Sequence, residues 1–336
     1  MPFEVYFASY GTGAATFAEL GHQVIDLQLP EENPFLDTFV RSAQLIRKNH
    51  PDLVVSHEEF AVLPAARALG IPTAFITDWF LHPKSLVMQT LMYADEIIFI
   101  GERDIFEEPA FVRHKVSYVG PVIRQMSYSR SDKARARREL YLSDYATIIS
   151  VIPGSWATEE RAPIAELLVP AFEALTEPER VLVWIAGQDY DTLSTRFAEA
   201  QGVFLKRDCW PTERLVVASD LVITKANRGT TLEVSALGVP SISISHGLNP
   251  IDDSIVSRIP TNTAFRAASI DSNFLGQAIR SILAKQFDHT AIPVSDGATL
   301  AAKVLASCIR KCSSHNSTIR RHIPTPRAQV GPAPGC

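Results

Sequence analysis

Short apolar, β-branched runs alternate with longer stretches of helical periodicity along most of the chain. The short runs predict buried parallel strands, and the stretches between them predict helices. Because strands and helices alternate, we expect an α/β protein with parallel, doubly wound sheets, which bind ligands at the carboxyl ends of their strands. In the first third of the chain the expected strands are 5–8, 23–27, 53–55, 73–77 and 96–100.

A polar segment separates this set from a second alternating set. It spans 125–132 and follows the tripeptide Gly120-Pro121-Val122, so we place a linker there. The chain is therefore expected to form two domains, 1–126 and 127–311. The expected strands of the second set are 147–152, 181–186, 203–205, 221–223 and 241–246.

The end of the chain differs in composition from the rest. A last helix is expected over 297–309, and beyond Lys311 the residues are mostly Ser, Arg, Pro and Gly without periodicity. Such a segment buries too little apolar surface to offset the entropy lost on folding. We therefore expect residues 312–336 to be a disordered tail.

Length, charge and cysteine content narrow the class of protein. The chain has 336 residues, 46% of them hydrophobic, which is enough for the cores of two domains. Its formal net charge of −5 gives no reason to expect a nucleic-acid partner, and one basic cluster, 133–138, is expected to be the solvated face of a helix. We recognise no signal peptide, no C-x-x-C pair and no apolar run of about 18 residues. A cytoplasmic protein is therefore expected, with peripheral contact to a membrane left open.

The stretch 219–238 combines a strand, a loop of small residues and the start of a helix. Thr230 and Glu233 have the spacing of a capping box, which predicts that the helix begins there. The backbone N–H groups at such a helix start attract phosphate, and Lys225 adds a mobile positive charge. An ordinary βαβ unit with a well-capped helix explains the same residues, and the stretch by itself does not decide between the two.

Acidic residues follow two of the strands expected in the first domain. Glu58 and Glu59 come after one strand, and Asp78 comes directly after the next. Because parallel strands end at the same edge of a sheet, these acids are candidates for a general base, although each could equally cap a helix. Residues 79–81, Trp-Phe-Leu, follow Asp78 and suit an acceptor that has an apolar part.

Four segments occur in the order that one known family shows. The segment 220–233, DLVITKANRGTTLE, resembles the donor-binding signature of GT-B glycosyltransferases of the family 28 type. This group includes the peptidoglycan N-acetylglucosaminyltransferase and the plant galactolipid synthases. The weaker similarities are 51–72 (PDLVVSHEEFAVLPAARALGIP), the Gly-Pro-Val turn with Arg124, and the Pro-Gly-Ser loop over 153–155. Together they imply two Rossmann-like, doubly wound domains that face each other across a cleft.

The resemblance implies that the second domain binds a nucleotide-sugar donor. The residues implied are, at the diphosphate, Gly154, Ser155, Lys225, Gly229, Thr230 and Thr231; at the ribose, Glu233; beside the base, Asp208 and Trp210; and facing the sugar, His246, Asn249, Asp252 and Asp253. Glu233 has the capping box as its alternative role, and His246 has that of a polar strand end.

Two features depart from the family. Asn227 stands where the family usually has glycine; asparagine tolerates a left-handed backbone, so we expect a similar loop with altered phosphate contacts. The chain also opens at what resembles the second strand of the family, so that about 30 residues, one βα unit, have no counterpart. We expect either a start site upstream of Met1 or a protein that lacks a central strand and part of its acceptor site, which would abolish activity.

The implied function is a hexosyltransferase. It would move a hexose or N-acetylhexosamine, with inversion, from a uridine diphosphate sugar to a hydroxyl of a lipid or small-molecule acceptor. A base must reach that hydroxyl, and Glu58 and Asp78 are the candidates. We read no D-x-D metal motif in the sequence, and the resemblance also implies independence of metal, so neither a metal nor another cofactor is expected. The alternatives are a nucleotide-sugar hydrolase or epimerase on the same fold, or a truncated, non-catalytic binder of nucleotide sugars.

Overall fold

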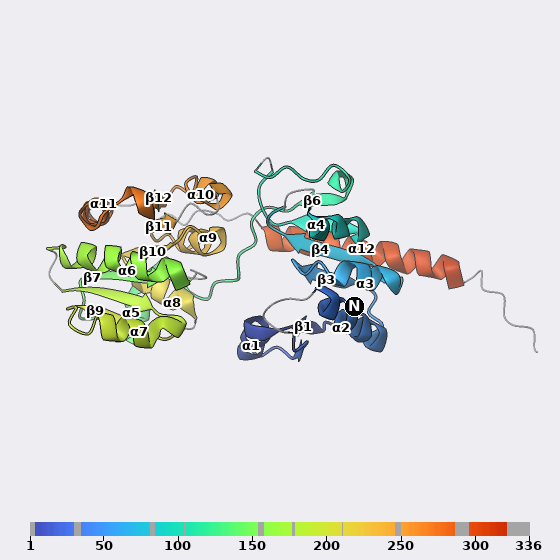
Figure 1. The fold of residues 1–336 in the computed structure, drawn as a ribbon, viewed down its shortest axis with the longest axis horizontal. Helices are drawn as coiled ribbons and strands as arrows, with labels where there is room; N and C mark the ends of the chain where they lie inside the picture. The colour runs from blue at the N-terminus through green and yellow to red at the C-terminus, as the bar shows by residue number, and fades with distance from the viewer. Residues whose placement is uncertain are drawn as a thin grey trace, which may run out of the picture. The chain divides into compact units, whose positions relative to one another are not determined.

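The structure is a computed structural model, and it describes residues 4–29, 35–80, 85–103, 105–153, 158–176, 179–209, 211–245, 250–285 and 296–320. These residues form two compact units (Figure 1). Unit 1 comprises the chain up to Val122 together with the residues from Asp296 onward, and unit 2 comprises Ile123–Ser295. The first boundary therefore lies close to the predicted one at 126–127.

Unit 2 is built on one six-stranded parallel sheet. Its strands are β7 (Thr147–Ile152), β8 (Arg180–Ile185), β9 (Val203–Lys206), β10 (Leu221–Lys225), β11 (Ser241–Ser245) and β12 (Asn262–Arg266). They lie in the order β12-β11-β10-β7-β8-β9, so the strand order reverses between β7 and β10. This is the doubly wound Rossmann order, whose ligands bind at the reversal. The sequence did not predict β12, whose half-buried residues at the sheet edge carry little apolar pattern.

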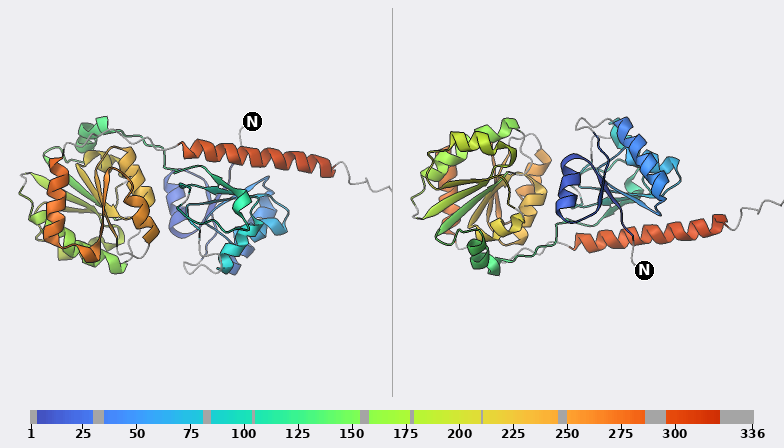
Figure 2. Two further views of the ribbon diagram at one scale, coloured as in Figure 1. Left: turned by 90° about the horizontal axis from the view of Figure 1, so that it is seen from above. Right: turned by 90° about the horizontal axis from the view of Figure 1, so that it is seen from below.

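Helices cover both faces of this sheet, as Figure 2 shows. They are α5 (Lys133–Glu139), α6 (Thr158–Glu173), α7 (Tyr190–Arg196), α8 (Thr212–Ala218), α9 (Arg228–Ala236), α10 (Pro250–Val256) and α11 (Ser272–Ala284). Neighbouring residues of β7 point to opposite faces: Ile149 packs in the core with α6 and α11, and Ile148 packs in the core with α5 and α8. Because both faces are buried, β7, β8 and β10 are largely apolar rather than alternating. β11 alternates serine with isoleucine, although all five of its residues are buried.

Unit 1 contains two separate parallel sheets. β3 (Val54–His57), β4 (Thr73–Thr77), β5 (Glu96–Phe99) and β6 (Val116–Tyr118) form one in that order, and β1 (Phe7–Ser9) pairs with β2 (Val24–Asp26) in the other. The helices of unit 1 are α1 (Gly11–Glu19), α2 (Phe35–Asn49), α3 (Val62–Ala68), α4 (Leu86–Gln89) and α12 (Gly297–Arg320). The main core packs Phe75, Ile97 and Phe99 against Leu63 of α3. No described helix of either unit is long and apolar enough to cross a membrane.

The last helix, α12, corrects two expectations. It belongs to unit 1 rather than to a second domain that ends at 311. Its first residue packs against the backbone of Pro121, near the end of the first segment of unit 1: a Cβ at Gly297 would lie 2.4 Å from the carbonyl oxygen of Pro121. The helix also continues to Arg320, so the tail expected from 312 onward is helical over its first part. The sequence has no glycine or proline between Gly297 and Pro324, and without a helix breaker the turns continue. Residues 321–336 lie outside the described part of the chain.

Candidate functional site

The two loops expected to hold a diphosphate follow neighbouring strands. β7 ends at Ile152 and β10 ends at Lys225, and Thr224 pairs in register with Ile152. The Thr224 hydroxyl also donates to the carbonyl of Ile152 at 2.8 Å, which ties the two strand ends together. Both loops therefore start at the reversal of strand order, where a doubly wound sheet binds its ligand. Gly154 and Ser155 themselves lie outside the described residues.

The start of α9 differs from the expected capping box. Asn227 is the N-cap: its side-chain oxygen accepts from the Thr230 amide at 3.1 Å, and its carbonyl accepts from the Thr231 amide at 3.1 Å. Its backbone is extended, with φ −120° and ψ 124°, so the expectation of a left-handed Asn227 is wrong. Asparagine is among the best N-caps, and the helix accordingly begins at Arg228 instead of after Thr230.

The residues of this helix start that are expected at the diphosphate differ in exposure. Gly229 is exposed in the first turn, where backbone amides have no acceptor within the helix. Lys225 is half-buried at the end of β10. Arg228, which the expected diphosphate site did not include, adds a second cation inside the same loop motif and is 8% exposed. Thr231 is fully buried, and its hydroxyl donates to the Asn227 carbonyl, so its side chain stabilises the loop from within the core.

Glu233 points to an arginine from the linker. The Nη2 atom of Arg124 lies 3.2 Å from Oε2 of Glu233, and both side chains are about three-quarters buried, with 28% and 26% exposed. Burial raises the pKa of Glu233, the ion pair with Arg124 works against that rise, and the nearby Glu213 adds to it. Glu213 is itself buried and accepts a hydrogen bond from the Ser127 amide at 2.9 Å. The sequence placed Arg124 in a turn motif, but it did not predict the ion pair of Arg124 with Glu233.

The other residues expected at the donor are less closely grouped. Asp208 is exposed after β9, three strands from β10, or about 14 Å at ordinary strand spacing. Asp253 lies on α10 and forms an ion pair with Arg266 of β12, with Asp253 Oδ2 3.4 Å from Arg266 Nε. Trp210, His246 and Asn249 lie outside the described residues, as does the side chain of Asp252.

In unit 1 the two candidate bases lie side by side. Oε1 of Glu58 accepts from the Thr77 hydroxyl at 3.1 Å and from the Asp78 amide at 3.4 Å, so the end of β3 is bonded to the end of β4. Glu58 has φ +58°, a left-handed backbone that costs a non-glycine residue free energy and often marks a functional site. Glu59 has a different role: it accepts from the Ala61 amide at the start of α3 and from the Tyr10 hydroxyl.

The apolar patch expected after Asp78 is only partly at the surface. Trp79 is 36% exposed, but Phe80 is 8% exposed and stacks on Phe99 in the core, with ring centroids 5.1 Å apart. The expectation that Phe80 faces an acceptor is therefore wrong, because an aromatic ring next to a buried strand gains more from packing than from exposure. Leu81 lies outside the described residues.

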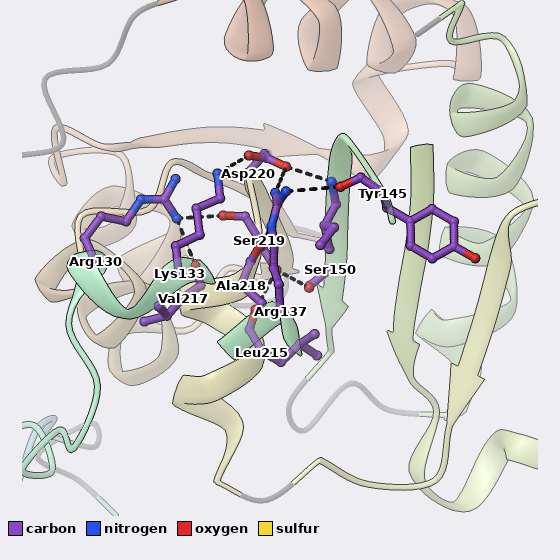
Figure 3. Close-up of polar contacts among 11 residues, drawn as sticks. Arg130, Lys133, Arg137, Tyr145, Ser150, Leu215, Val217, Ala218, Ser219 and Asp220 are labelled. Carbon is purple, nitrogen blue, oxygen red and sulfur yellow. Dashed lines mark hydrogen bonds and ion pairs between the residues drawn. The ribbon is translucent and has the colours of Figure 1, made fainter. Parts of the chain in front are cut away.

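The basic cluster 133–138 is not simply a solvated face. Lys133 and Arg137 of α5 both form ion pairs with Asp220, which also accepts from the Ile148 amide (Figure 3). Arg130, just before α5, donates to the carbonyls of Val217 and Ser219 at the end of α8. Burial lowers the pKa of both Arg130 and Lys133. These side chains hold the linker and the start of β10 in place, whereas Arg135 and Arg138 of the same helix are exposed.

The expectation that the sequence contains no D-x-D triplet is wrong. Asp189-Tyr190-Asp191 is a D-x-D triplet, and Asp191 forms an ion pair with Arg207, its Oδ1 lying 2.7 Å from Nη2. Within the described residues no group of three His, Cys, Asp or Glu side chains is close enough to hold a metal ion.

Comparison of the sequence with known proteins finds similarity to glycosyltransferases. No family model matches the chain. It is 24% identical over 223 residues to the UDP-N-acetylglucosamine--N-acetylmuramyl-(pentapeptide) pyrophosphoryl-undecaprenol N-acetylglucosamine transferase of Exiguobacterium, covering 61% of this chain and 58% of that protein. It is 22% identical over 279 residues to an uncharacterized glycosyltransferase of Methanopyrus kandleri, covering 79% and 78%.

Solved structures show the same architecture at lower identity. The MurG structure of Acinetobacter baumannii superposes with a TM-score of 0.58 at 15% identity, covering 86% of this chain and 84% of that one. A putative UDP-N-acetylglucosamine 2-epimerase of Listeria monocytogenes superposes with a TM-score of 0.65 at 14% identity, covering 91% and 87%. The chain thus has the GT-B fold with two Rossmann-like domains, and in sequence it is similar to glycosyltransferases of the MurG type.

Proposed function

We propose that this protein is a glycosyltransferase that moves a hexose or N-acetylhexosamine from a uridine diphosphate sugar to a hydroxyl of a lipid or small-molecule acceptor, with inversion at the anomeric carbon. The observation that carries the proposal is that the two loops expected to hold the donor both start at the strand reversal between β7 and β10. The curated relatives support the transferase class, since one is named as an N-acetylglucosamine transferase and the other as a glycosyltransferase.

The donor diphosphate fits the start of α9. The first-turn amides and the N-terminal end of the helix dipole favour an anion there. Lys225 and Arg228 supply positive charge from either side of Asn227. When the bond from sugar to phosphate breaks, the charge that develops on the leaving nucleoside diphosphate is stabilised by these same groups.

The base fits the acidic pair in unit 1. The acceptor hydroxyl attacks the anomeric carbon, its proton passes to a carboxylate, and the nucleoside diphosphate leaves from the opposite face of the sugar. Glu58 already accepts from Thr77 and from the Asp78 amide, so it is suited to hold the turn in place. Asp78 is therefore our candidate for the base, and Glu58 for a residue that positions it.

The donor assignment is tested by calorimetry with UDP and with uridine. Lys225→Ala should weaken UDP binding by about 1.5–3 kcal/mol, the loss of one charge-assisted contact, and leave uridine unchanged. The matched control is Lys206→Ala, since Lys206 ends β9 at the far edge of the same sheet. Equal losses for UDP and uridine, or no binding of UDP by the unaltered protein, would overturn the assignment.

An epimerase is the second candidate, and the superposition on the Listeria monocytogenes structure favours it. The two functions differ in what they need. An epimerase or hydrolase consumes UDP-N-acetylglucosamine without an acceptor, whereas a transferase leaves the sugar nucleotide largely intact until an acceptor is added. Incubating the protein with the sugar nucleotide alone, and following both free UDP and the stereochemistry of the sugar by NMR, separates them.

A further inference from the structure

We propose that Arg124 sets the preference for a ribonucleotide: its guanidinium holds the Glu233 carboxylate in the orientation in which Glu233 accepts the ribose hydroxyls. This inference rests on the proposed function. It deepens that function by naming a residue, outside the donor loop, that positions one of the donor-binding groups.

The ion pair with Arg124 is made through one of the two carboxylate oxygens of Glu233. Arg124 Nη2 lies 3.2 Å from Oε2, and Oε1 is the second acceptor of the same carboxylate. A carboxylate oxygen has two lone pairs and can accept two hydrogen bonds. Oε1 can therefore accept from the 2′ and 3′ hydroxyls of one ribose while Oε2 stays with the arginine.

The environment of Glu233 explains why such a partner is needed. The carboxylate is mostly buried and lies near the buried Glu213, and both conditions raise the pKa of Glu233. Protonation would turn one acceptor oxygen into a donor and spoil the match to two hydroxyl donors. Arg124 opposes the rise in pKa, so it keeps the acceptor charged as well as oriented.

Arg124 can act in this way because the linker is itself fastened to unit 2. Three residues beyond it, the Ser127 amide donates to Glu213 of α8 at 2.9 Å. Further along, Arg130 donates to the carbonyls of Val217 and Ser219 at the end of α8. The arginine therefore approaches α9 from a backbone that is already held in place, so its fork loses little freedom in holding the carboxylate.

The test measures the ratio of the dissociation constants of 2′-deoxy-UDP and UDP in the full-length protein. A lost hydrogen bond to a charged acceptor corresponds to about tenfold or more, so the unaltered protein should show a ratio of at least about ten. Arg124→Gln should bring the ratio to within about threefold of one. Arg124→Lys should restore part of it, because lysine keeps the charge but loses the planar fork.

Four further variants make the result specific to this pair. Glu233→Gln should also lower the ratio, and the double variant Arg124→Gln/Glu233→Gln should fall no further than either single one, because the two residues act together. Lys225→Ala should weaken both nucleotides equally and leave the ratio unchanged. Arg138→Gln, exposed on α5, should change neither affinity nor ratio. Thermal unfolding of each variant shows whether it is folded. If Arg124→Gln does not fold, the ratio measured for Arg124→Lys is used in its place.

The pH dependence of UDP affinity distinguishes this role of Arg124 from a purely structural one, which would leave that dependence unchanged. The charged groups that face Glu233 are Arg124 of the linker and Glu213 of α8; on α10, Asp253 is engaged by Arg266. Removing Arg124 leaves burial and Glu213 unopposed, so in Arg124→Gln the acidic loss of UDP affinity should begin at a higher pH than in the unaltered protein.

The outcomes separate the two proposals. If the unaltered protein binds no UDP, the proposed function and this inference both fail. If it binds UDP with a ratio near one, or if Arg124→Gln keeps both the original ratio and the original pH profile, the inference is overturned and the donor assignment stands.

Discussion

Glu58 accepts a hydrogen bond from the hydroxyl of Thr77, 3.1 Å away, while its own backbone is held in the left-handed region at φ +58°. Glu58 directly follows β3, and its carboxylate therefore reaches across to Thr77 at the end of β4. The same oxygen reaches the amide of Asp78, which fixes the turn that carries the candidate base.

The two acids should respond differently to amide substitution. Asp78→Asn should lower kcat about a hundredfold or more, since a general base typically contributes that much. Glu58→Gln should lower kcat far less, because the amide oxygen of glutamine still accepts from Thr77 and from the Asp78 backbone. Steady-state kinetics with a working acceptor measure both. The reverse order of effects would assign Glu58 as the base.

The N-cap of α9 predicts a graded series of stabilities. Asn227→Ala removes the acceptor of the Thr230 amide and should lower the free energy of unfolding by about 1 kcal/mol. Asn227→Asp should be nearly neutral, and Asn227→Gly should cost a few tenths of a kcal/mol, about what an N-cap glycine costs elsewhere. Urea unfolding monitored by circular dichroism gives the values. Equal stability of all three variants would contradict the capping role.

Gly229→Ala should separate stability from ligand binding. Gly229 is helical, and a Cβ added there would meet only the Asn227 side-chain oxygen at 3.4 Å. Alanine should therefore stabilise the fold by up to about 1 kcal/mol, as it does in exposed helix positions. The added methyl group would nevertheless cover the first-turn amides, so UDP binding should weaken. Thermal unfolding and calorimetry on one preparation test both parts, and unchanged UDP affinity would place the diphosphate elsewhere.

Gly297 should tolerate no side chain at the start of α12. The Cβ of alanine would lie 2.4 Å from the Pro121 carbonyl and 2.8 Å from that of Gly120, and backbone atoms do not yield as a flexible side chain does. Gly297→Ala should therefore cost about 1–3 kcal/mol of unfolding free energy in spite of its better helix propensity. Thr299→Ala, exposed two residues on, is the control and should be close to neutral. A stabilised Gly297→Ala variant would show that α12 does not pack here.

In unit 2 the local pattern of apolar residues predicted most of the strands correctly. Apolar runs such as 147–152 and 221–223 are strands because they are long enough and β-branched enough to be buried on both faces, and the structure confirms them within two residues. The same information was too weak for β12, where a half-buried edge strand has no continuous apolar run. The fold class followed from the alternation itself, because alternating strands and helices have few other ways to pack.

What the sequence determined by itself was therefore the set of elements, the parallel sheets and the presence of small residues and cations at a helix start. Tertiary structure alone decided which partner each polar side chain takes. Asn227, and not Thr230, is the N-cap of α9. Glu233 forms an ion pair with Arg124, which is distant along the chain. Phe80 went into the core while its neighbour Trp79 stayed partly exposed. The reason is physical: periodicity and propensity act between residues a few positions apart, whereas ion pairs and ring packing depend on distances that exist only once the chain has folded.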